Sequence, residues 1–206
     1  MVATGTAVNA IDVGDRVIMT TVLLPQGGTW AEFAVAPEKT VSRLPEALDF
    51  PIAAGIPIAG GAAVEALHTL HLESGNTLFV AGGSGAIGTL LIQMATRRGI
   101  RIAASASAPN HAYMQSLGAE LVVDYRDPSW PDQVKRWAPG GVDAALPIPP
   151  GIAAECLAVV RDGGHLVTVS GDSGSVPSER SIRIGQFQHR PDTRADMAKL
   201  VDDIAA

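Results

Sequence analysis

Glycines at a fixed spacing stand between two apolar segments of this chain. The segment TLFVA (77–81) has the pattern of a short buried strand, and it leads into Gly83-Ser84-Gly85-Ala86-Ile87-Gly88. Apolar residues then recur at helical spacing, at Ile87, Leu90, Leu91, Met94 and Ala95. A strand, a GxGxxG turn and a helix within about 30 residues are typical of a loop that binds a dinucleotide.

The glycines of such a loop have separate physical roles. One permits the tight turn, the next lets the backbone approach a pyrophosphate, and Gly88 lets the helix pack closely on the strand. The unpaired N–H groups and the positive dipole end of the helix then face the phosphates. The alternative is a glycine-rich turn without a ligand, since the chain has 22 glycines in which such spacings can arise by chance.

The end of the second predicted strand, RIAAS (101–105), indicates which dinucleotide to expect. In NAD-binding units a carboxylate about 20 residues past the motif holds the ribose 2′-OH, but this chain has Ser105, Ala106 and Ser107 there. No carboxylate repels a 2′-phosphate at this place, and two hydroxyls can donate hydrogen bonds to it. We therefore expect NADPH in preference to NADH.

A positive partner for the 2′-phosphate is less evident in the sequence. Three arginines are near in sequence, and ordinary solvated surface charge is the alternative interpretation of them. Two further residues after the strand offer hydrogen bonds only. These five residues are Arg97, Arg98, Arg101, Asn110 and His111.

Composition excludes several classes of function. Charged residues make up 17% and hydrophobic residues 47% of the 206 residues, which is typical of a well-buried α/β chain and not of a disordered one. The net charge of −6 and the scattered Lys and Arg residues argue against a nucleic-acid surface. The sequence has no long apolar run and no basic-then-apolar leader, so we expect a cytoplasmic protein with no membrane segment.

Strand and helix patterns alternate over most of the chain, which predicts a parallel sheet covered on both faces. Further strands are expected at 121–124, 142–146, 165–170 and 181–188, with a turn at RDGG (161–164) before the fifth. Helices are expected at 109–118, 128–137, 152–160 and 192–204, and a Pro-interrupted apolar helix pair at 51–72. The predicted fold class is α/β, a Rossmann doubly wound parallel six-stranded sheet, over residues 49–206.

The first 48 residues have a different, β-rich pattern. Val13 to Val17 predicts a turn that feeds a strand, and Ala31 to Val35 alternates as a half-buried strand does. These pieces are too few to close a domain alone.

The order of these motifs resembles the medium-chain dehydrogenase/reductase superfamily. It is carried by VGDRV, by GGTWAEFAVAPEKTVSRLPEALDFPIAAGIPIAGGAAVEAL, by AGGSGAIG, and by LGAELVVDYRD, GVDAAL and RDGGHLVTVSG. Within it the chain is most similar to the zinc-free quinone oxidoreductase branch, which includes the zeta-crystallin-like enzymes. The resemblance implies that residues 1–48 are a remnant of a GroES-like catalytic domain, and that the chain is truncated at both ends relative to the family.

The resemblance also implies which residues bind the cofactor, NADPH (NADP). The glycine loop, residues 83–88, matches the family's pyrophosphate loop, and three further groups match the adenosine and nicotinamide-ribose ends. Asn110 stands where relatives often have a lysine, and Ala62 stands where they often have a threonine. The implied cofactor-binding residues are Gly83, Ser84, Gly85, Ala86, Ile87, Gly88, Ser105, Ser107, Tyr125, Ser170 and Gly171.

The function implied by the resemblance is an NADPH-dependent, zinc-independent oxidoreductase that transfers hydride to a quinone or an α,β-unsaturated carbonyl. Two alternatives stay open: an NADPH-binding module without turnover of its own, and an enoyl reductase of a lipid or polyketide pathway. The sequence nominates no catalytic residue and no metal ligand set. Family likeness further implies a small-molecule substrate and a homodimer formed through the edge strand 181–188.

Several other residues that could be catalytic or bind a metal have simpler structural explanations. Ser84 is not in a GxSxG elbow, so a Ser-His-Asp hydrolase is disfavoured. Glu65, His68 and His71 can be imagined as metal ligands, but no further ligand accompanies them. Cys156, the single cysteine, lies in an apolar helical stretch and is expected to be a buried thiol. We expect Asp143 to bind local backbone and not to be catalytic.

Overall fold

The computed structural model describes residues 1–20, 29–171, 179–186, 190 and 192–206. It divides into two compact units, one made of residues 1–64 with the C-terminal residues from 189 on, the other of residues 65–188. Each unit is described by itself. No helix among the described residues is both long and apolar enough to cross a bilayer.

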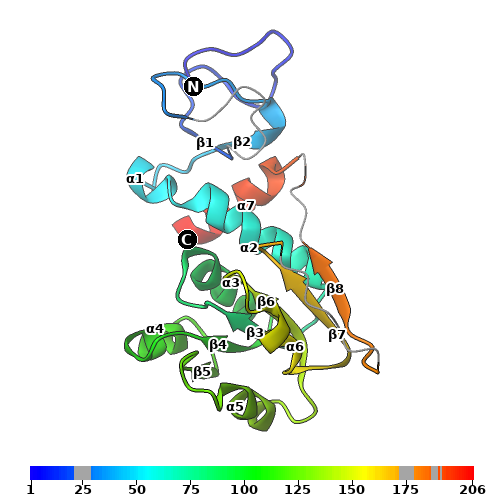
Figure 1. Cartoon of the computed structure of the whole chain (residues 1–206). Helices are drawn as coiled ribbons and strands as arrows, with labels where there is room; N and C mark the ends of the chain where they lie inside the picture. Colours follow the sequence, from blue (N-terminus) through cyan, green and yellow to red (C-terminus); the bar gives the residue numbers. More distant parts are fainter. Residues whose placement is uncertain (21–28, 172–178, 187–189, 191) are drawn as a thin grey trace. The chain divides into compact units, whose positions relative to one another are not determined.

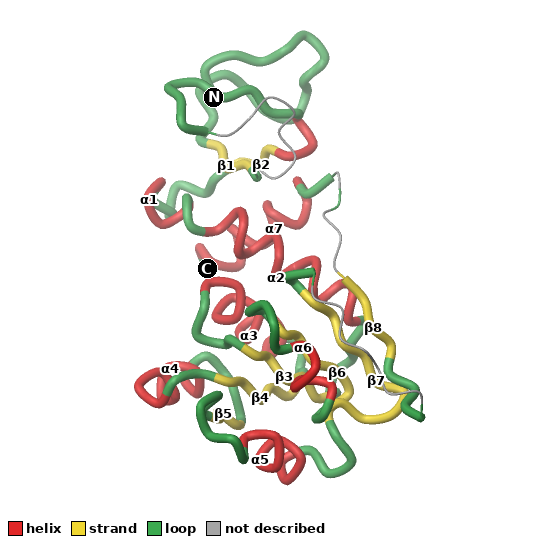
Figure 2. The backbone as a smooth tube through the Cα atoms, viewed as in Figure 1, coloured by secondary structure: helices red, strands yellow, loops and turns green. Residues whose placement is uncertain are grey.

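The larger unit, residues 65–188, is built on a parallel sheet of six strands in the order β5-β4-β3-β6-β7-β8 (Figure 1). The two halves of the sheet extend in opposite directions from the central pair β3 and β6, which confirms the predicted doubly wound topology. The strands are β3 (Thr77–Ala81), β4 (Arg101–Ser105), β5 (Leu121–Val123), β6 (Val142–Pro147), β7 (Val160–Thr168) and β8 (Arg183–Gln186). Figure 2 shows that helices and loops alternate with these strands along the chain.

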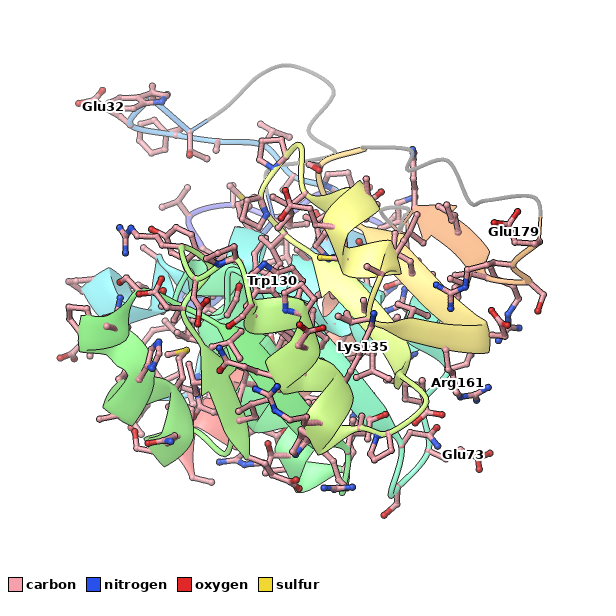
Figure 3. All side chains as sticks on the ribbon, turned by 60° about the horizontal axis from the view of Figure 1, so that its bottom comes forward. Glu32, Glu73, Trp130, Lys135, Arg161 and Glu179 are labelled. Atoms are coloured by element: carbon pink, nitrogen blue, oxygen red, sulfur yellow. The ribbon has the colours of Figure 1, made fainter. Side chains whose placement is uncertain are left out.

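Helices cover the sheet because both its faces are apolar. One face carries a core cluster that includes Phe79 of β3 and Trp130 of α5, whose rings stack with centroids 4.9 Å apart. Trp130, labelled in Figure 3, is the first residue of its helix. The helices that belong wholly to this unit are α3 (Ala86–Arg97), α4 (His111–Ser116, preceded by the 3₁₀ turn η2, Ala108–Asn110), α5 (Trp130–Trp137) and α6 (Ala153–Leu157).

Strand β7 differs from the prediction, which placed its start at His165 after a turn. The strand begins at Val160, and residues 161–164 (RDGG) bulge out of it, because the partner register moves from Val142↔Val160 directly to Ala144↔His165. Gly163 adopts φ +73°, a conformation that glycine permits at no steric cost. The preceding helix is therefore shorter than the predicted 152–160.

Strand β8 covers only part of its predicted range. It pairs with β7 in parallel from His165↔Arg183 to Thr168↔Gln186 and forms the edge of the sheet. The predicted strand at 181–188 extends beyond it, and residues 187 and 188 lie outside the described part of the chain.

The smaller unit contains an antiparallel pair, β1 (Val17–Met19) with β2 (Val41–Arg43), and a short 3₁₀ turn η1 (Glu38–Thr40). The Ser42 hydroxyl donates to the Arg194 carbonyl at 2.8 Å, which fixes α7 (Arg194–Ala205) beside β2. Helix α1 (Phe50–Ala53) precedes α2 (Ile56–Leu70), as the predicted interrupted helix pair requires, and α2 continues into the larger unit.

The strand predicted at 31–35 is wrong. These residues form no regular element, and Phe33 and Val35 are 72% and 87% exposed. An alternating pattern forms a strand only where a neighbouring strand accepts its backbone bonds and one face is covered. In the described part of this unit β1 pairs instead with β2, a strand that the sequence pattern did not reveal.

The predicted division into residues 1–48 and 49–206 stays a prediction, as does the GroES-like origin of the first part. By its contacts, the structure groups residues 49–64 and helix α7 with the N-terminal part of the chain. The sheet that would hold a dinucleotide lies wholly within residues 65–188.

Candidate dinucleotide site

The glycine loop begins one residue before the predicted motif. Gly82, directly after β3, has φ +81°, and its carbonyl accepts a hydrogen bond from the Gly85 N–H at 3.1 Å. A side chain at this position would be strained, so Gly82 and not Gly83 makes the tight turn. The sequence signal for it was the extra glycine in front of the GxGxxG spacing, which our assignment left out.

Gly83 and Gly88 are needed for close packing. A Cβ atom on Gly83 would lie 2.9 Å from the Ala104 Cβ of the neighbouring strand β4. A Cβ atom on Gly88 would lie 2.5 Å from the Gly83 carbonyl oxygen and 2.7 Å from that of Gly82. The helix therefore approaches the loop at a distance that only glycine allows, which is the role predicted for Gly88.

The outer side of the loop is open to a ligand. Gly85 is the N-cap of α3, and both Gly85 and Ala86 are exposed. The Thr89 N–H donates to the Gly85 carbonyl at 2.9 Å, which starts the hydrogen bonding of the helix. The N–H groups at the first helical positions, Ala86, Ile87 and Gly88, have no acceptor within the helix and are suited to phosphate oxygens.

The loop lies where the two halves of the sheet part. It follows β3, whose other neighbour β6 runs parallel to it and ends at Pro147. The Ile148 N–H donates to the Ala81 carbonyl at 3.2 Å, and a Cβ atom on Gly82 would meet the Pro149 ring at 2.8 Å. Ligands of open α/β sheets bind at this switch point, beyond the carboxyl ends of the strands.

Ser105 supports the loop and is 4% exposed. Its Oγ atom accepts a hydrogen bond from the Gly82 N–H at 3.1 Å, and its carbonyl accepts one from the Gly83 N–H at 2.9 Å. The sequence predicted that this hydroxyl faces a 2′-phosphate. In the structure this hydroxyl is bonded to the loop, because β4 lies beside β3 and brings the end of one strand against the loop of the other. Its contact with a 2′-phosphate stays a prediction.

Ser107 lies further out and is half-buried. Its Oγ atom accepts a hydrogen bond from the Asn110 side-chain amide at 3.1 Å, and the Asn110 N–H donates to the Ser107 carbonyl at 2.8 Å. The His111 ring lies 3.1 Å, through Nε2, from the Ala106 carbonyl. These bonds give the segment after β4 a defined conformation before any ligand arrives.

The arginines proposed as cations for the phosphate lie at the amino ends of the strands, opposite the glycine loop. Strand β4 begins at Arg101 and ends at Ser105. Helix α3 starts at the loop and ends at Arg97, with Arg98 as its C-cap. Arg101 is also engaged, since its Nη2 atom donates to Glu120 at 2.7 Å. Hydrogen bonding to Glu120 raises the pKa of Arg101 and keeps it charged. Arg101 is therefore an exposed surface charge, as the alternative interpretation held, and it is paired with Glu120.

Tyr125 follows β5 at the same edge as Ser107. Ser105 and Val123 are register partners, and the Ala106 N–H donates to the Val123 carbonyl at 3.0 Å. Ser107 and Tyr125 are each two residues past this pair. The Tyr125 ring is exposed and is not buried against the sheet.

Ser170 and Gly171 follow the end of β7, on the opposite side of the switch point from β4 and β5. Both are exposed, and the Gly171 carbonyl accepts a hydrogen bond from the Gln186 side chain at 3.1 Å. The predicted site residues thus all belong to the larger unit and lie at or beyond the carboxyl ends of β3, β4, β5 and β7. Their contact with a cofactor stays a prediction.

Two side chains that the sequence analysis set aside have structural roles. Asp143 accepts hydrogen bonds from the Thr77 backbone N–H at 2.7 Å and from the Thr77 hydroxyl at 2.8 Å, as its predicted local role requires. Cys156 is buried, and desolvation raises the pKa of its thiol to about 12. Within the described ranges, no three His, Cys, Asp or Glu side chains gather in a way that could hold a metal ion.

Comparison with known proteins gives consistent matches. Residues 86–190, half of the chain, match the family model described as zinc-binding dehydrogenase. The chain is 31% identical over 148 residues to the chloroplastic NADPH-dependent alkenal/one oxidoreductase of Arabidopsis thaliana, which covers 71% of this chain and 37% of that protein. It is 29% identical to the quinone oxidoreductase of Homo sapiens over 84% of this chain and 53% of that protein.

The fold is shared with solved structures. The quinone oxidoreductase of Coxiella burnetii superposes with a TM-score of 0.83 at 23% identity, over 98% of this chain and 63% of that one. The chain spans about half the length, or less, of the curated relatives named above.

Proposed function

Because this chain belongs to the medium-chain dehydrogenase/reductase superfamily, in its quinone oxidoreductase branch, we propose that it binds NADPH and serves hydride transfer to a quinone or an α,β-unsaturated carbonyl compound. The observation that carries the proposal is the loop Gly82–Gly88, whose glycines bring backbone N–H groups to the open N-terminal end of α3. The names of the two relatives, one of which includes NADPH, support the choice of cofactor and of substrate class.

The residues present fit a dinucleotide at this edge of the sheet. The N–H groups of Ala86, Ile87 and Gly88 would hold the pyrophosphate, since a helix N-terminus favours negative charge. Ser107 and Tyr125, beyond β4 and β5, would bind the adenosine end, and Ser170 and Gly171, beyond β7, the nicotinamide ribose.

The bound nicotinamide supplies the hydride, and the protein's part is to bind, orient and exclude water. Ser105 accepts hydrogen bonds from the N–H groups of Gly82 and Gly83. These bonds hold the loop in place, so we expect it to need little reorganisation when a phosphate binds. The structure nominates no side chain as proton donor. Zinc independence is part of the proposal, and metal analysis of the purified protein tests it: a stoichiometric zinc ion would contradict it.

The primary experiment titrates the purified chain with NADPH and with NADH and follows nicotinamide fluorescence. The proposal expects binding of NADPH in clear preference to NADH. Steady-state oxidation of NADPH with a simple quinone, and in parallel with a crotonyl thioester, then separates the alternatives. Turnover with the quinone supports the proposed activity, turnover with the thioester alone identifies an enoyl reductase, and binding without turnover identifies a cofactor-binding module.

We also propose that the protein is cytoplasmic and forms a homodimer through the predicted strand 181–188. Among the described strands, β8 is the edge of the sheet, and an edge strand has backbone groups that can pair with another strand. Light scattering on the purified protein tests the dimer, and a monomeric mass would contradict it. Fractionation of the source cells tests the location.

A further inference from the structure

A cation at the carboxyl ends of β4 and β5 would favour NADPH over NADH. A 2′-phosphate brings up to about two negative charges to this edge, and hydroxyls alone compensate them weakly. The segments that follow the two strands, 106–120 and 124–129, contain one arginine and no lysine. That arginine is Arg126, which the sequence analysis did not consider.

The turn after β5 places Arg126 beside Tyr125. The Asp127 N–H donates to the Asp124 carbonyl at 3.0 Å, so Tyr125 and Arg126 are the two central residues of this turn. Because the Ala106 N–H is bonded to the Val123 carbonyl, the turn begins where the segment containing Ser107 also leaves the sheet. The two segments thus start from adjoining points at one edge.

The guanidinium group of Arg126 contacts an aromatic ring and is otherwise exposed. Its Cζ atom lies 4.6 Å from the centroid of the Tyr125 ring, a cation–π contact that limits its freedom. Its nearest carboxylate, Asp124, is 3.8 Å away from Nη1, a loose ion pair, and the Arg126 side chain is 62% exposed. A guanidinium in this state can form paired hydrogen bonds with a phosphate.

The other carboxylate of this turn is engaged elsewhere. Asp127 accepts hydrogen bonds from the Ser129 N–H and hydroxyl, both at 2.8 Å, and from the Gln133 amide at 2.7 Å. It therefore anchors the start of α5 and does not compete for the guanidinium. Across the turn, the Ser107 Oγ atom accepts its bond from Asn110, so its own hydrogen can be donated to a phosphate oxygen.

We propose that Arg126, held against the Tyr125 ring, is the residue that selects a 2′-phosphorylated nucleotide, with the Ser107 hydroxyl as a second donor. This inference rests on the proposed function and names the group that gives it cofactor selectivity. It also separates the two serines of the predicted site, since Ser105 supports the loop and Ser107 faces the ligand.

Calorimetric titration of the whole chain with NADPH, NADH and adenosine 2′,5′-bisphosphate tests the proposal. Arg126→Gln should weaken binding of NADPH and of the bisphosphate by about tenfold or more, with NADH binding unchanged. Arg126→Lys should retain part of the preference because a point charge remains. The matched control is Arg98→Gln at the opposite edge of the sheet, which should change neither affinity.

The outcomes distinguish this inference from the proposed function. If Arg126→Gln keeps the wild-type preference, or if the wild-type chain binds NADPH and NADH equally, the inference is overturned while dinucleotide binding stands. If none of the three compounds binds the wild-type chain, the proposed function fails and the inference fails with it. Raising the salt concentration should reduce the wild-type preference and have little effect on that of Arg126→Gln.

Discussion

The hydroxyl oxygen of Ser105 lies 3.1 Å from the backbone nitrogen of Gly82 and accepts its hydrogen bond. This bond joins the last residue of β4 to the first residue of the loop after β3. A second bond, from the Gly83 N–H to the Ser105 carbonyl at 2.9 Å, runs parallel to it. One buried serine thus holds the turn from which the helix α3 starts.

Replacing Ser105 by alanine should loosen the loop. The half-buried Gly82 N–H would lose its acceptor, which costs about 1 kcal/mol in the free energy of unfolding. Because NADPH and NADH share the pyrophosphate that the loop is proposed to hold, their affinities should fall by the same factor. Chemical denaturation and fluorescence titration of Ser105→Ala measure the two effects.

Ser107→Ala is the control for this prediction. It removes a half-buried hydroxyl that has no bond to the glycine loop, so stability should change little and the NADPH affinity should fall more than the NADH affinity. A selective loss of NADPH binding in Ser105→Ala would show that this hydroxyl, and not that of Ser107, meets the 2′-phosphate.

Gly88→Ala should destabilise the protein and reduce dinucleotide binding. The new Cβ atom would lie 2.5 Å from a backbone oxygen, so α3 must shift away from the loop, at a cost of roughly 1–3 kcal/mol. The control is Gly61→Ala in α2, where the added Cβ would meet no described atom within 4 Å apart from the helix's own backbone and the adjacent residues. That change should raise the free energy of unfolding by about 0.5–1 kcal/mol. Equal effects of the two substitutions in denaturant titrations would refute the packing argument.

Asp143 should make stability depend on pH in the acid range. Burial alone would raise the pKa of Asp143, but the hydrogen bonds from Thr77 and Arg161 outweigh it and hold the pKa below its usual value. A carboxyl whose pKa is lower in the folded state stabilises the protein above the unfolded-state pKa of about 3.9. That stabilisation is lost as the pH falls through the folded-state pKa.

The corresponding variant is Asp143→Asn, which gives up the ion pair with Arg161 at 2.8 Å. We expect its free energy of unfolding to be lower than wild type by about 1–2 kcal/mol at pH 7, and the difference to shrink below about pH 4. Urea titrations at pH 7 and pH 3 measure it, with Glu73→Gln as the control. Glu73 and Arg161 are both labelled in Figure 3. A pH-independent difference would contradict the role given to the charge.

Cys156 should be unreactive in the folded protein. Its thiol is buried, and desolvation raises its pKa to about 12, so almost no thiolate exists at pH 8. A disulfide reagent such as Ellman's should react with one thiol per chain in denaturant and with a negligible fraction under native conditions. Rapid labelling of the native protein would mean that the core around α6 opens easily.

The elements whose signal is local were predictable from the sequence. The apolar run at 77–81, the glycine spacing and the periodic residues of α3 lie within one continuous segment, so their pattern alone indicated strand, turn and helix. The alternation of such segments also predicted the parallel sheet, because parallel strands need crossover helices. The prediction of a strand at 31–35 was wrong because strand formation also depends on a distant partner strand. The local alternation of residues gives no information about whether that partner is present.

Tertiary structure alone decided how distant residues meet. Ser105 and Gly82 are 23 positions apart, and only the register of β4 beside β3 brought the serine hydroxyl into contact with the loop. Arg101 begins β4 and so lies at the amino ends of the strands, away from the glycine loop. Arg126 lies in the turn after β5, at the carboxyl ends of the strands. Residue type and spacing therefore determined that a glycine loop joins a strand to a helix. Strand order and register, which depend on packing across the whole sheet, determined which side chains contact that loop.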